Sequence, residues 1–154
     1  MSLLTKHNMA VAPNTEEQHS AYLTGKSLCL FTAKPEMSWI IDSGAIDYIT
    51  PHLHLFKSPV PVTRACFINM LNGKSVQVKN IGTVLLNGSI LLKDVLYVPD
   101  FQFNLLSASK LAKTLSSNVV FTPTYCYLLD HLKNNQLVLG SETGGLYLAA
   151  TDLR

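Results

Sequence analysis

The segment most informative about the architecture reads Trp39-Ile40-Ile41-Asp42-Ser43-Gly44-Ala45. Its three leading apolar residues predict a buried strand, which ends at a carboxylate followed by a hydroxyl and a glycine. Two carboxyl groups that share a proton can hydrolyse a peptide bond, one as general base on water and the other as general acid. The strand would hold Asp42 in a fixed, partly desolvated position. Ser43 would orient the loop, and Gly44 would allow the close approach of a second backbone. These three residues are the candidate catalytic residues.

From residue 38 onward the chain reads as short strands separated by turns. The pairs Asn72-Gly73 and Asn87-Gly88 each lie between alternating apolar segments, which is the strongest short-range signal for a β-hairpin. Residues 105–116 have helical spacings and no Gly or Pro, so they predict one short helix. Further strands are predicted over 95–98, 119–121, 125–129, 136–139 and 145–148. We therefore expect an all-β fold, a small barrel or sandwich with one short helix.

The first 35 residues differ from the rest of the chain. Residues 12–20 are polar and aperiodic, and Pro35 closes the region. We interpret residues 1–35 as a poorly ordered linker or tail that contains a short strand at 27–32. One domain then spans residues 36–150, a length that suits a single hydrophobic core.

The composition argues against several classes of partner. Hydrophobic residues make up 47% of the chain and charged residues 14%, which is typical of a folded domain. The formal net charge of +2 gives no electrostatic reason to expect binding to nucleic acid or to an anionic membrane. The N-terminus lacks the apolar core of a secretory signal, and no run of about 18 apolar residues predicts a membrane span. We expect a soluble, cytoplasmic protein.

No metal or cofactor site is predicted. The three cysteines form no C-x-x-C pair and lie apart from the histidines, so buried free thiols are expected. His52 and His54 alternate with apolar residues but have no third ligand, which favours a partly exposed strand or turn. Ser107 and Ser109 lack the context of a nucleophile, and helix capping or a surface position explains them.

Three blocks of the sequence resemble the protease region of copia-type retrotransposon Gag-Pol polyproteins, a retropepsin-like aspartic protease. The first block is 39–50, around Asp42-Ser43-Gly44. The second is 92–100, continued by 104–107 and Lys110-Leu111. The third, 145–148, is similar to the start of the pre-integrase region of that family. An Asp-Ser-Gly triplet alone has low specificity, whereas three blocks in the family's order over residues 37–150 are specific.

The resemblance implies a small closed barrel of the acid-protease type, with residues 118–150 running into the pre-integrase region. It also implies that Ala45, Ile46 and Asp47 border the substrate, because retroviral relatives have a main-chain-binding aspartate at the place of Ile46. The family usually has a hydroxyl residue at position 46 and a histidine at position 48, where this chain has Ile46 and Tyr48. Both departures bear on substrate affinity and activity rather than on the fold.

The number of Asp-Ser-Gly triplets predicts the assembly. The triplet occurs once, so a single chain supplies one carboxylate. A homodimer would supply the second by placing both copies of Asp42 on a two-fold axis, as the resemblance also implies. The hairpin 66–78, with Asn72 and Gly73 at its tip, is the predicted flap over the substrate. A tip at residues 80–82 and an ordinary hairpin without a gating role are the alternatives.

Two functions are therefore expected. The first is an aspartic endopeptidase that works as a homodimer on a few sites of its own polyprotein, without metal or cofactor. The alternative is a catalytically inactive, host-resident remnant that keeps the fold as a binding or structural module. Ile46 and Tyr48 favour this alternative, and a peptide-cleavage assay distinguishes the two.

Overall fold

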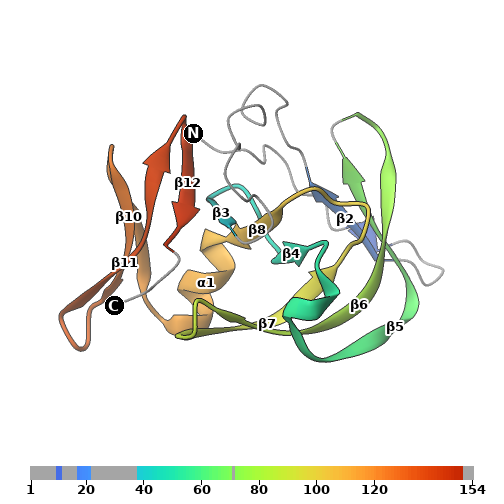
Figure 1. Cartoon of the computed structure of the whole chain (residues 1–154), viewed down its shortest axis with the longest axis horizontal. Coiled ribbons are helices and arrows are strands. Elements are labelled where there is room, and N and C mark those ends of the chain that lie inside the picture. Colours follow the sequence, from blue (N-terminus) through green and yellow to red (C-terminus); the bar gives the residue numbers. More distant parts are fainter. Residues whose placement is uncertain (1–9, 12–16, 22–37, 71, 151–154) are drawn as a thin grey trace.

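A computed structural model describes residues 10–11, 17–21, 38–70 and 72–150 of the chain. Their strands form one sheet of 12 strands, in the order β1-β2-β5-β6-β7-β4-β8-β3-β12-β11-β10-β9 (Figure 1). The elements are β1 Ala10–Val11, β2 Glu17–Ala21, β3 Trp39–Asp42, β4 Ile49–Thr50, a 3-10 turn Leu53–Leu55, β5 Phe56–Met70, β6 Ser75–Leu86, β7 Ile90–Tyr97, β8 Asn104–Ser107, α1 Ala108–Leu115, β9 Asn118–Phe121, β10 Tyr125–Asp130, β11 Asn135–Thr143 and β12 Leu146–Ala149. The all-β class with one short helix is confirmed.

The sheet is open, so the expectation of a closed barrel is wrong. Among the described residues the strand order begins at β1 and ends at β9, and no strand pairing joins these two edges. The closed barrel was expected from the family resemblance and from the many short strands in the sequence. A barrel closes only when its first and last strands pair with each other. Here the C-terminal strands continue the sheet beyond β3, and α1 packs against the edge strand β9. Figure 1 shows these strands at one end of the molecule and the β5–β6 hairpin at the other.

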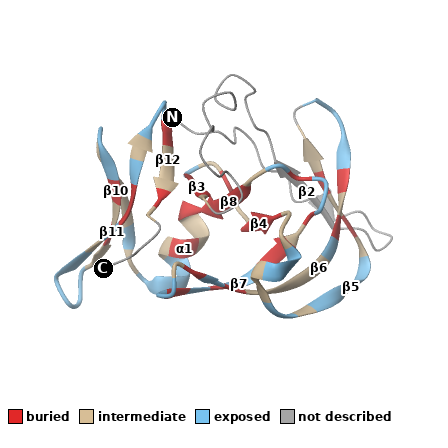
Figure 2. Ribbon diagram, viewed as in Figure 1, coloured by how far each residue is buried: buried red, intermediate tan, exposed pale blue. Residues whose placement is uncertain are grey.

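Two hydrophobic clusters lie on opposite faces of the central strands β3 and β8. Trp39 and Ile41 of β3 belong to the first cluster, and Ile40 belongs to the second. Leu106 and Leu105 of β8 divide between the clusters in the same way. Because successive side chains of a strand point to opposite faces, both strands are buried on both faces, which explains their uninterrupted apolar runs. Figure 2 shows buried residues concentrated in these central elements.

The two hairpins predicted from Asn-Gly pairs are both present. β5 and β6 pair as an antiparallel hairpin around Asn72 and Gly73, and Gly73 has a φ of +79°, which suits glycine. The alternative tip at residues 80–82 is wrong, because these residues lie within β6. β6 and β7 form the second hairpin around Asn87 and Gly88, both with positive φ. Turn residues that tolerate the left-handed region therefore fix both hairpins.

The helix is shorter than predicted. α1 begins only after Ser107, whereas Leu105 and Leu106 lie in β8. The prediction over 105–116 is wrong at its start because adjacent apolar residues suit a strand buried on both faces as well as a helix. The Ser107 hydroxyl accepts a hydrogen bond of 3.1 Å from the Lys110 amide and so caps the helix where the strand ends.

The C-terminal strands attach to the centre of the sheet. β9 to β12 match the four strands predicted after the helix, and Asn134, Gly144 and Gly145 have positive φ at the turns between them. β12 pairs with β3 on the side opposite β8, so the strand that carries Asp42 has a neighbour on each side.

The N-terminal segment interpreted as a linker contains two strands. β2 pairs with β5 in parallel, and β1 pairs with β2. The strand expected at 27–32 lies outside the described residues. Within the described ranges, no helix has the length and apolar character required to cross a membrane.

Replacing Gly140 with Ala should destabilise the C-terminal part of the sheet. Gly140 pairs with Ala149 across β11 and β12, and an added Cβ would lie 1.9 Å from the carbonyl oxygen of Leu148. Because that oxygen belongs to the backbone, β12 would have to move, and the free energy of unfolding should fall by about 1–3 kcal/mol. Urea denaturation measures this loss, with Ser141→Ala at the neighbouring exposed position as control. An unchanged midpoint for Gly140→Ala would contradict the close packing of these strands.

Candidate active site

Asp42 is the last residue of β3 and is fixed by the neighbouring strands. It lies opposite Ser107 of β8, and only 2% of the residue is exposed. Its Oδ1 accepts a hydrogen bond of 2.8 Å from the Gly44 amide, which turns the chain directly after the strand. Ser43 is exposed at this turn. The predicted triplet thus forms a tight turn at the end of a strand whose register is set on both sides.

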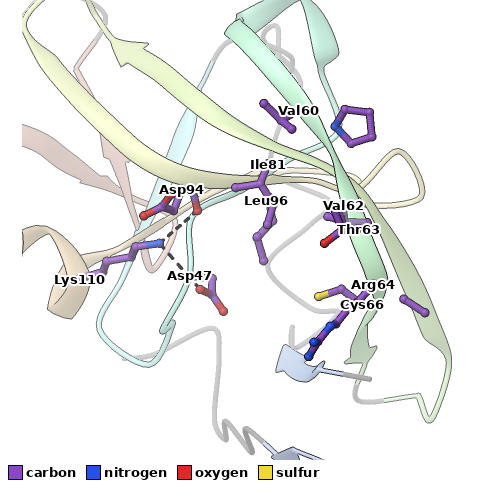
Figure 3. Close-up of a pocket in the computed structure, with 12 residues that line it drawn as sticks. Asp47, Val60, Val62, Thr63, Arg64, Cys66, Ile81, Asp94, Leu96 and Lys110 are labelled. Atoms are coloured by element: carbon purple, nitrogen blue, oxygen red, sulfur yellow. Dashed lines mark hydrogen bonds and ion pairs between the residues drawn. The ribbon is translucent and has the colours of Figure 1, made fainter. Parts of the chain in front are cut away.

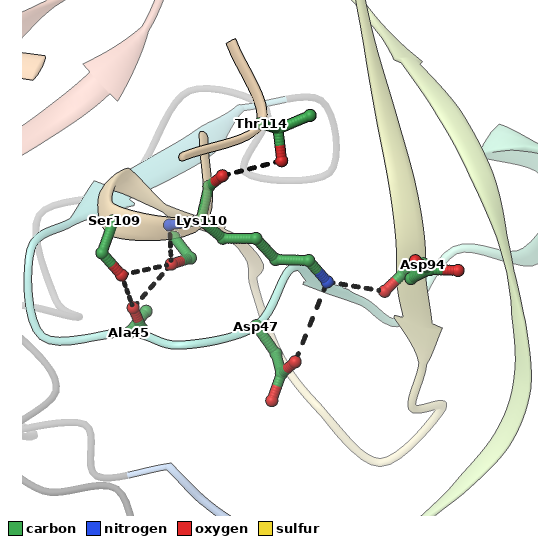
Figure 4. Close-up of polar contacts among 7 residues, drawn as sticks. Ala45, Asp47, Asp94, Ser109, Lys110 and Thr114 are labelled. Carbon is green, nitrogen blue, oxygen red and sulfur yellow. Dashed lines mark hydrogen bonds and ion pairs between the residues drawn. The ribbon is translucent and has the colours of Figure 1, made fainter. Parts of the chain in front are cut away.

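The loop after Asp42 is tied to the beginning of α1. The Ala45 carbonyl accepts one hydrogen bond of 2.6 Å from the Ser107 hydroxyl and one of 3.2 Å from the Ser109 hydroxyl (Figure 4). One serine therefore caps the helix and also anchors the loop. The capping follows from the sequence. The contacts with Ala45 do not, because no local pattern links residues 62 positions apart.

Lys110 joins the same loop to β7. Its Nζ donates to the Asp94 carbonyl at 3.1 Å and lies 3.9 Å from Oδ1 of Asp47 (Figure 4). It also lies 4.7 Å from the ring centroid of Tyr48. Burial raises the pKa of Tyr48 to about 12, and the Thr114 hydroxyl opposes part of this rise. Tyr48 therefore contributes a neutral aromatic face at ordinary pH rather than a titrating group.

A hollow of about 490 Å³ opens beside this loop (Figure 3). Asp47, Asp94 and Lys110 lie on one side of it, and the β5 segment 60–66 lies on the other. Its charged residues are two acids and two bases, and most of the others are apolar. The complete lining is Asp47, Val60, Pro61, Val62, Thr63, Arg64, Ala65, Cys66, Ile81, Asp94, Leu96 and Lys110. This balance suits an occupant without a large net charge.

Asp42 does not line this hollow in the single chain, although the strand directs it to the same side. Alternation along β3 places Asp42 on the face of Ile40. Ile40 belongs to the hydrophobic cluster that includes Cys66 and Leu96, and both of these residues line the hollow. The carboxylate and the hollow therefore lie on one face of the central strands, and Asp47 extends from the Asp42 loop to the hollow.

The structure brings only some of the predicted substrate-binding residues to this hollow. Asp47 lines it, whereas Ala45 is buried and Ile46 is partly buried nearby. Asn72 and Gly73 lie at the tip of the β5–β6 hairpin and do not line it. Asn72 instead borders a separate hollow of about 230 Å³.

Sequence reasoning missed Lys110, Arg64 and Asp94 as residues of the site. Asp94 and Lys110 belong to the second block of the family resemblance, but that block gave them no role in the site. The side-chain contacts of Lys110 depend on β7 and on the Asp42 loop, and both are distant in sequence.

Cys66 lines this hollow, whereas His52, His54, His131 and Cys126 do not. The rings of His52 and His54 have centroids 5.6 Å apart. In the part of the chain that the structure describes, no group of three His, Cys, Asp or Glu residues could hold a metal ion. Cys66 and Cys126 are buried free thiols, as expected, and burial raises the pKa of Cys126 to about 12.

The sequence matches the model of a known protein family. Residues 39–115 match the family model described as the Pol polyprotein, beta-barrel domain. The matched region begins at the first residue of β3 and ends at the last residue of α1, so it contains Asp42, its loop and the hollow.

The chain is also similar to transposon proteins of a plant and of yeast. A retrovirus-related Pol polyprotein from transposon RE2 of Arabidopsis thaliana is 28% identical over 113 residues, which cover 71% of this chain and 8% of the relative. A transposon Ty5-1 protein of Saccharomyces cerevisiae is 33% identical over 98 residues, covering 60% of this chain and 66% of the relative. The Pol polyprotein from transposon RE1 of Arabidopsis thaliana is 25% identical over 124 residues, 79% of this chain and 8% of the relative. The chain therefore corresponds to a small part of the two plant polyproteins.

Proposed function

Because this chain belongs to the Pol polyprotein β-barrel domain family, we propose that it is an aspartic endopeptidase of a copia-type retrotransposon polyprotein. The observation that carries the proposal is the position of Asp42. Its buried carboxylate ends a strand that is held on both sides, and its loop leads directly to a hollow of about 490 Å³. The names of the relatives, which are Pol polyproteins from transposons, support the same origin.

The proposed reaction uses two copies of Asp42 that share one proton. The ionised carboxylate removes a proton from a water molecule, and the water oxygen attacks the peptide carbonyl carbon. The protonated carboxyl donates its proton to the carbonyl oxygen, which gives a tetrahedral diol. The carboxyl that took the water proton then donates it to the leaving nitrogen, the other carboxylate takes back a proton from the diol, and the bond between carbonyl carbon and nitrogen breaks. The Gly44 amide, which donates to Oδ1, would keep each carboxylate in one orientation.

The second carboxylate would come from a second copy of this chain. Asp-Ser-Gly occurs once in the sequence, so we propose a homodimer with Asp42 of each protomer on the two-fold axis. This places the retropepsin-like arrangement in the dimer rather than in one chain. The other expected participant is an extended polypeptide, a site of the same polyprotein.

The hollow is the proposed place for this polypeptide. Its apolar wall, including Val62, Ile81 and Leu96, would take an aliphatic side chain, and Asp47 would face the polypeptide from the Asp42 loop. The β5–β6 hairpin forms the opposite wall. A movement of this hairpin, with Asn72 and Gly73 at the tip, would cover the bound chain and exclude water.

A specific observation favours the alternative function, a non-catalytic binding or structural module. Asp42 is 2% exposed in the single chain, and Tyr48 is packed into the core at the position where the resemblance expects a histidine. A remnant that no longer opens this carboxylate to substrate would keep the sheet and the hollow but would not hydrolyse peptides.

The wild-type chain should cleave members of a peptide library at acid to near-neutral pH. A broad acid-protease inhibitor should block cleavage, and activity per chain should rise with concentration as sedimentation shows dimers forming. Cleavage that is insensitive to the inhibitor would contradict the mechanism, and a protein that is monomeric at high concentration would contradict the shared site. A dimeric protein that binds peptides without cleaving them would favour the non-catalytic module.

A further inference from the structure

Lys110 lies where three separate parts of the site meet. Its side chain extends from α1 toward the Asp42 loop and β7 (Figure 4). The Nζ atom is 3.1 Å from the carbonyl oxygen of Asp94, 3.9 Å from Oδ1 of Asp47 and 4.7 Å from the centre of the Tyr48 ring. One cation therefore contacts a backbone oxygen, a carboxylate and an aromatic face, and two of these partners belong to the loop that follows Asp42.

The contact with Asp94 depends on an irregularity in β7. Asp94 has a φ of 55°, and the pairing of β6 with β7 shifts its register between Gly82 and Val84. A residue in the left-handed region interrupts the regular ladder, and here its carbonyl accepts the Lys110 ammonium. The bulge thus gives Lys110 a backbone anchor in the sheet that does not depend on the Asp42 loop.

The loop is also anchored to α1 independently of the Lys110 side chain. Ser107 and Ser109 both donate to the Ala45 carbonyl, which holds the half of the loop nearest Asp42. Lys110 holds the other half, where Asp47 borders the hollow. The two sets of contacts therefore act on different ends of a short segment.

We propose that Lys110 is a positioning residue that fixes the Asp47 side of the hollow relative to β7 and so sets the geometry in which substrate is bound. This inference rests on the proposed function. Lys110 acts through Asp47 and Tyr48 and does not touch the reacting atoms. Its contribution to global stability should be small, because its side chain is 25% exposed and its ion pair is partly screened by solvent.

The central test compares Lys110→Met with Lys113→Met in the full chain. Both substitutions remove one lysine charge from α1, and Lys113 is exposed. A displacement of about 1 Å in a substrate-binding site can lower the rate about 100-fold. If the Asp47 side of the hollow shifts, we expect kcat/KM to fall by about 10- to 100-fold for Lys110→Met. Most of that loss should be in KM, because the Gly44–Asp42 bond is unchanged. Lys113→Met should match the wild type, and an equal loss in both variants would contradict the proposal.

Substitutions of the partners identify the contact responsible. Tyr48→Phe keeps the aromatic face and should have little effect, whereas Tyr48→Leu removes it and should raise KM. The double variant Lys110→Met/Asp47→Asn should lose less than the sum of the two single losses, because both changes break the connection between Lys110 and Asp47. Fully additive losses would show that Lys110 does not act through Asp47.

Hydrogen exchange of the backbone amides at residues 46–48, the half of the loop that Lys110 contacts, tests the positioning without any cleavage. These amides should exchange about 10-fold faster in Lys110→Met, at an unchanged urea midpoint, and at the wild-type rate in Lys113→Met. Unchanged exchange in Lys110→Met would overturn the proposal, as would faster exchange with wild-type KM. If the wild-type protein cleaves no peptide, the proposed function fails, and the exchange rates still decide whether Lys110 holds the loop.

Discussion

Asp42→Asn should abolish peptide cleavage while the protein remains folded and dimeric. The amide has almost the same shape as the carboxylate, and its oxygen can still accept the hydrogen bond that the Gly44 amide donates to Oδ1. It cannot act as a general base, and it cannot share a proton with the second copy. The loss should appear in kcat and reach the background of the assay. Dimer affinity should stay equal at the pH where the wild-type pair holds its shared proton, and should exceed that of the wild type at higher pH, where both carboxylates would ionise and repel each other.

The experiment requires cleavage and sedimentation measurements on one preparation of each variant. Asp130→Asn is the matched control, because the Asp130 carboxylate also accepts backbone hydrogen bonds at the end of a strand, from the Leu132 and Lys133 amides. It should cleave like the wild type. Cleavage that survives Asp42→Asn would rule out the catalytic assignment, and a variant that no longer dimerises would show that Asp42 has a structural role in the interface.

Leu106→Ala should lower the free energy of unfolding by about 2–5 kcal/mol. Leu106 has no exposed surface and lies in the first hydrophobic cluster, where β8 pairs with β3. Truncation would leave a cavity in the hydrophobic cluster that also contains Trp39 and Ile41 of the Asp42 strand. Urea denaturation measures the loss. The control is Leu115→Ala at the end of α1, where the leucine is exposed and its truncation should change the midpoint little. A midpoint equal to that of the wild type would contradict the central position of β8.

Local chemistry made the hairpins predictable. Asn-Gly pairs specify a tight turn by themselves, so Asn72-Gly73 and Asn87-Gly88 located two hairpins without knowledge of the rest of the fold. The strand before Asp42 was equally predictable, because three apolar residues are followed by Asp-Ser-Gly, which marks the end of the strand. The placement of Asp42 at the end of a buried strand followed from the same pattern.

Features that depend on distant partners were not predictable. Leu105 and Leu106 form a strand only because both faces of β8 are covered, and their sequence is compatible with a helix as well. Whether the sheet closes into a barrel depends on where its two edge strands lie. The number of predicted strands does not determine this. The contacts of Lys110 join α1, β7 and the loop after Asp42. No sequence pattern in any of these segments predicts that the three lie close together.

The pairing of β12 with β3 delays the assembly of the site during synthesis. Ile41 pairs with Tyr147, which leaves the ribosome about 100 residues later. The hairpins of β5, β6 and β7 have short loops and can form early, whereas a contact between such distant residues carries a large entropic cost of loop closure. A nascent chain therefore holds Asp42 on a strand with one side uncovered until β12 has emerged.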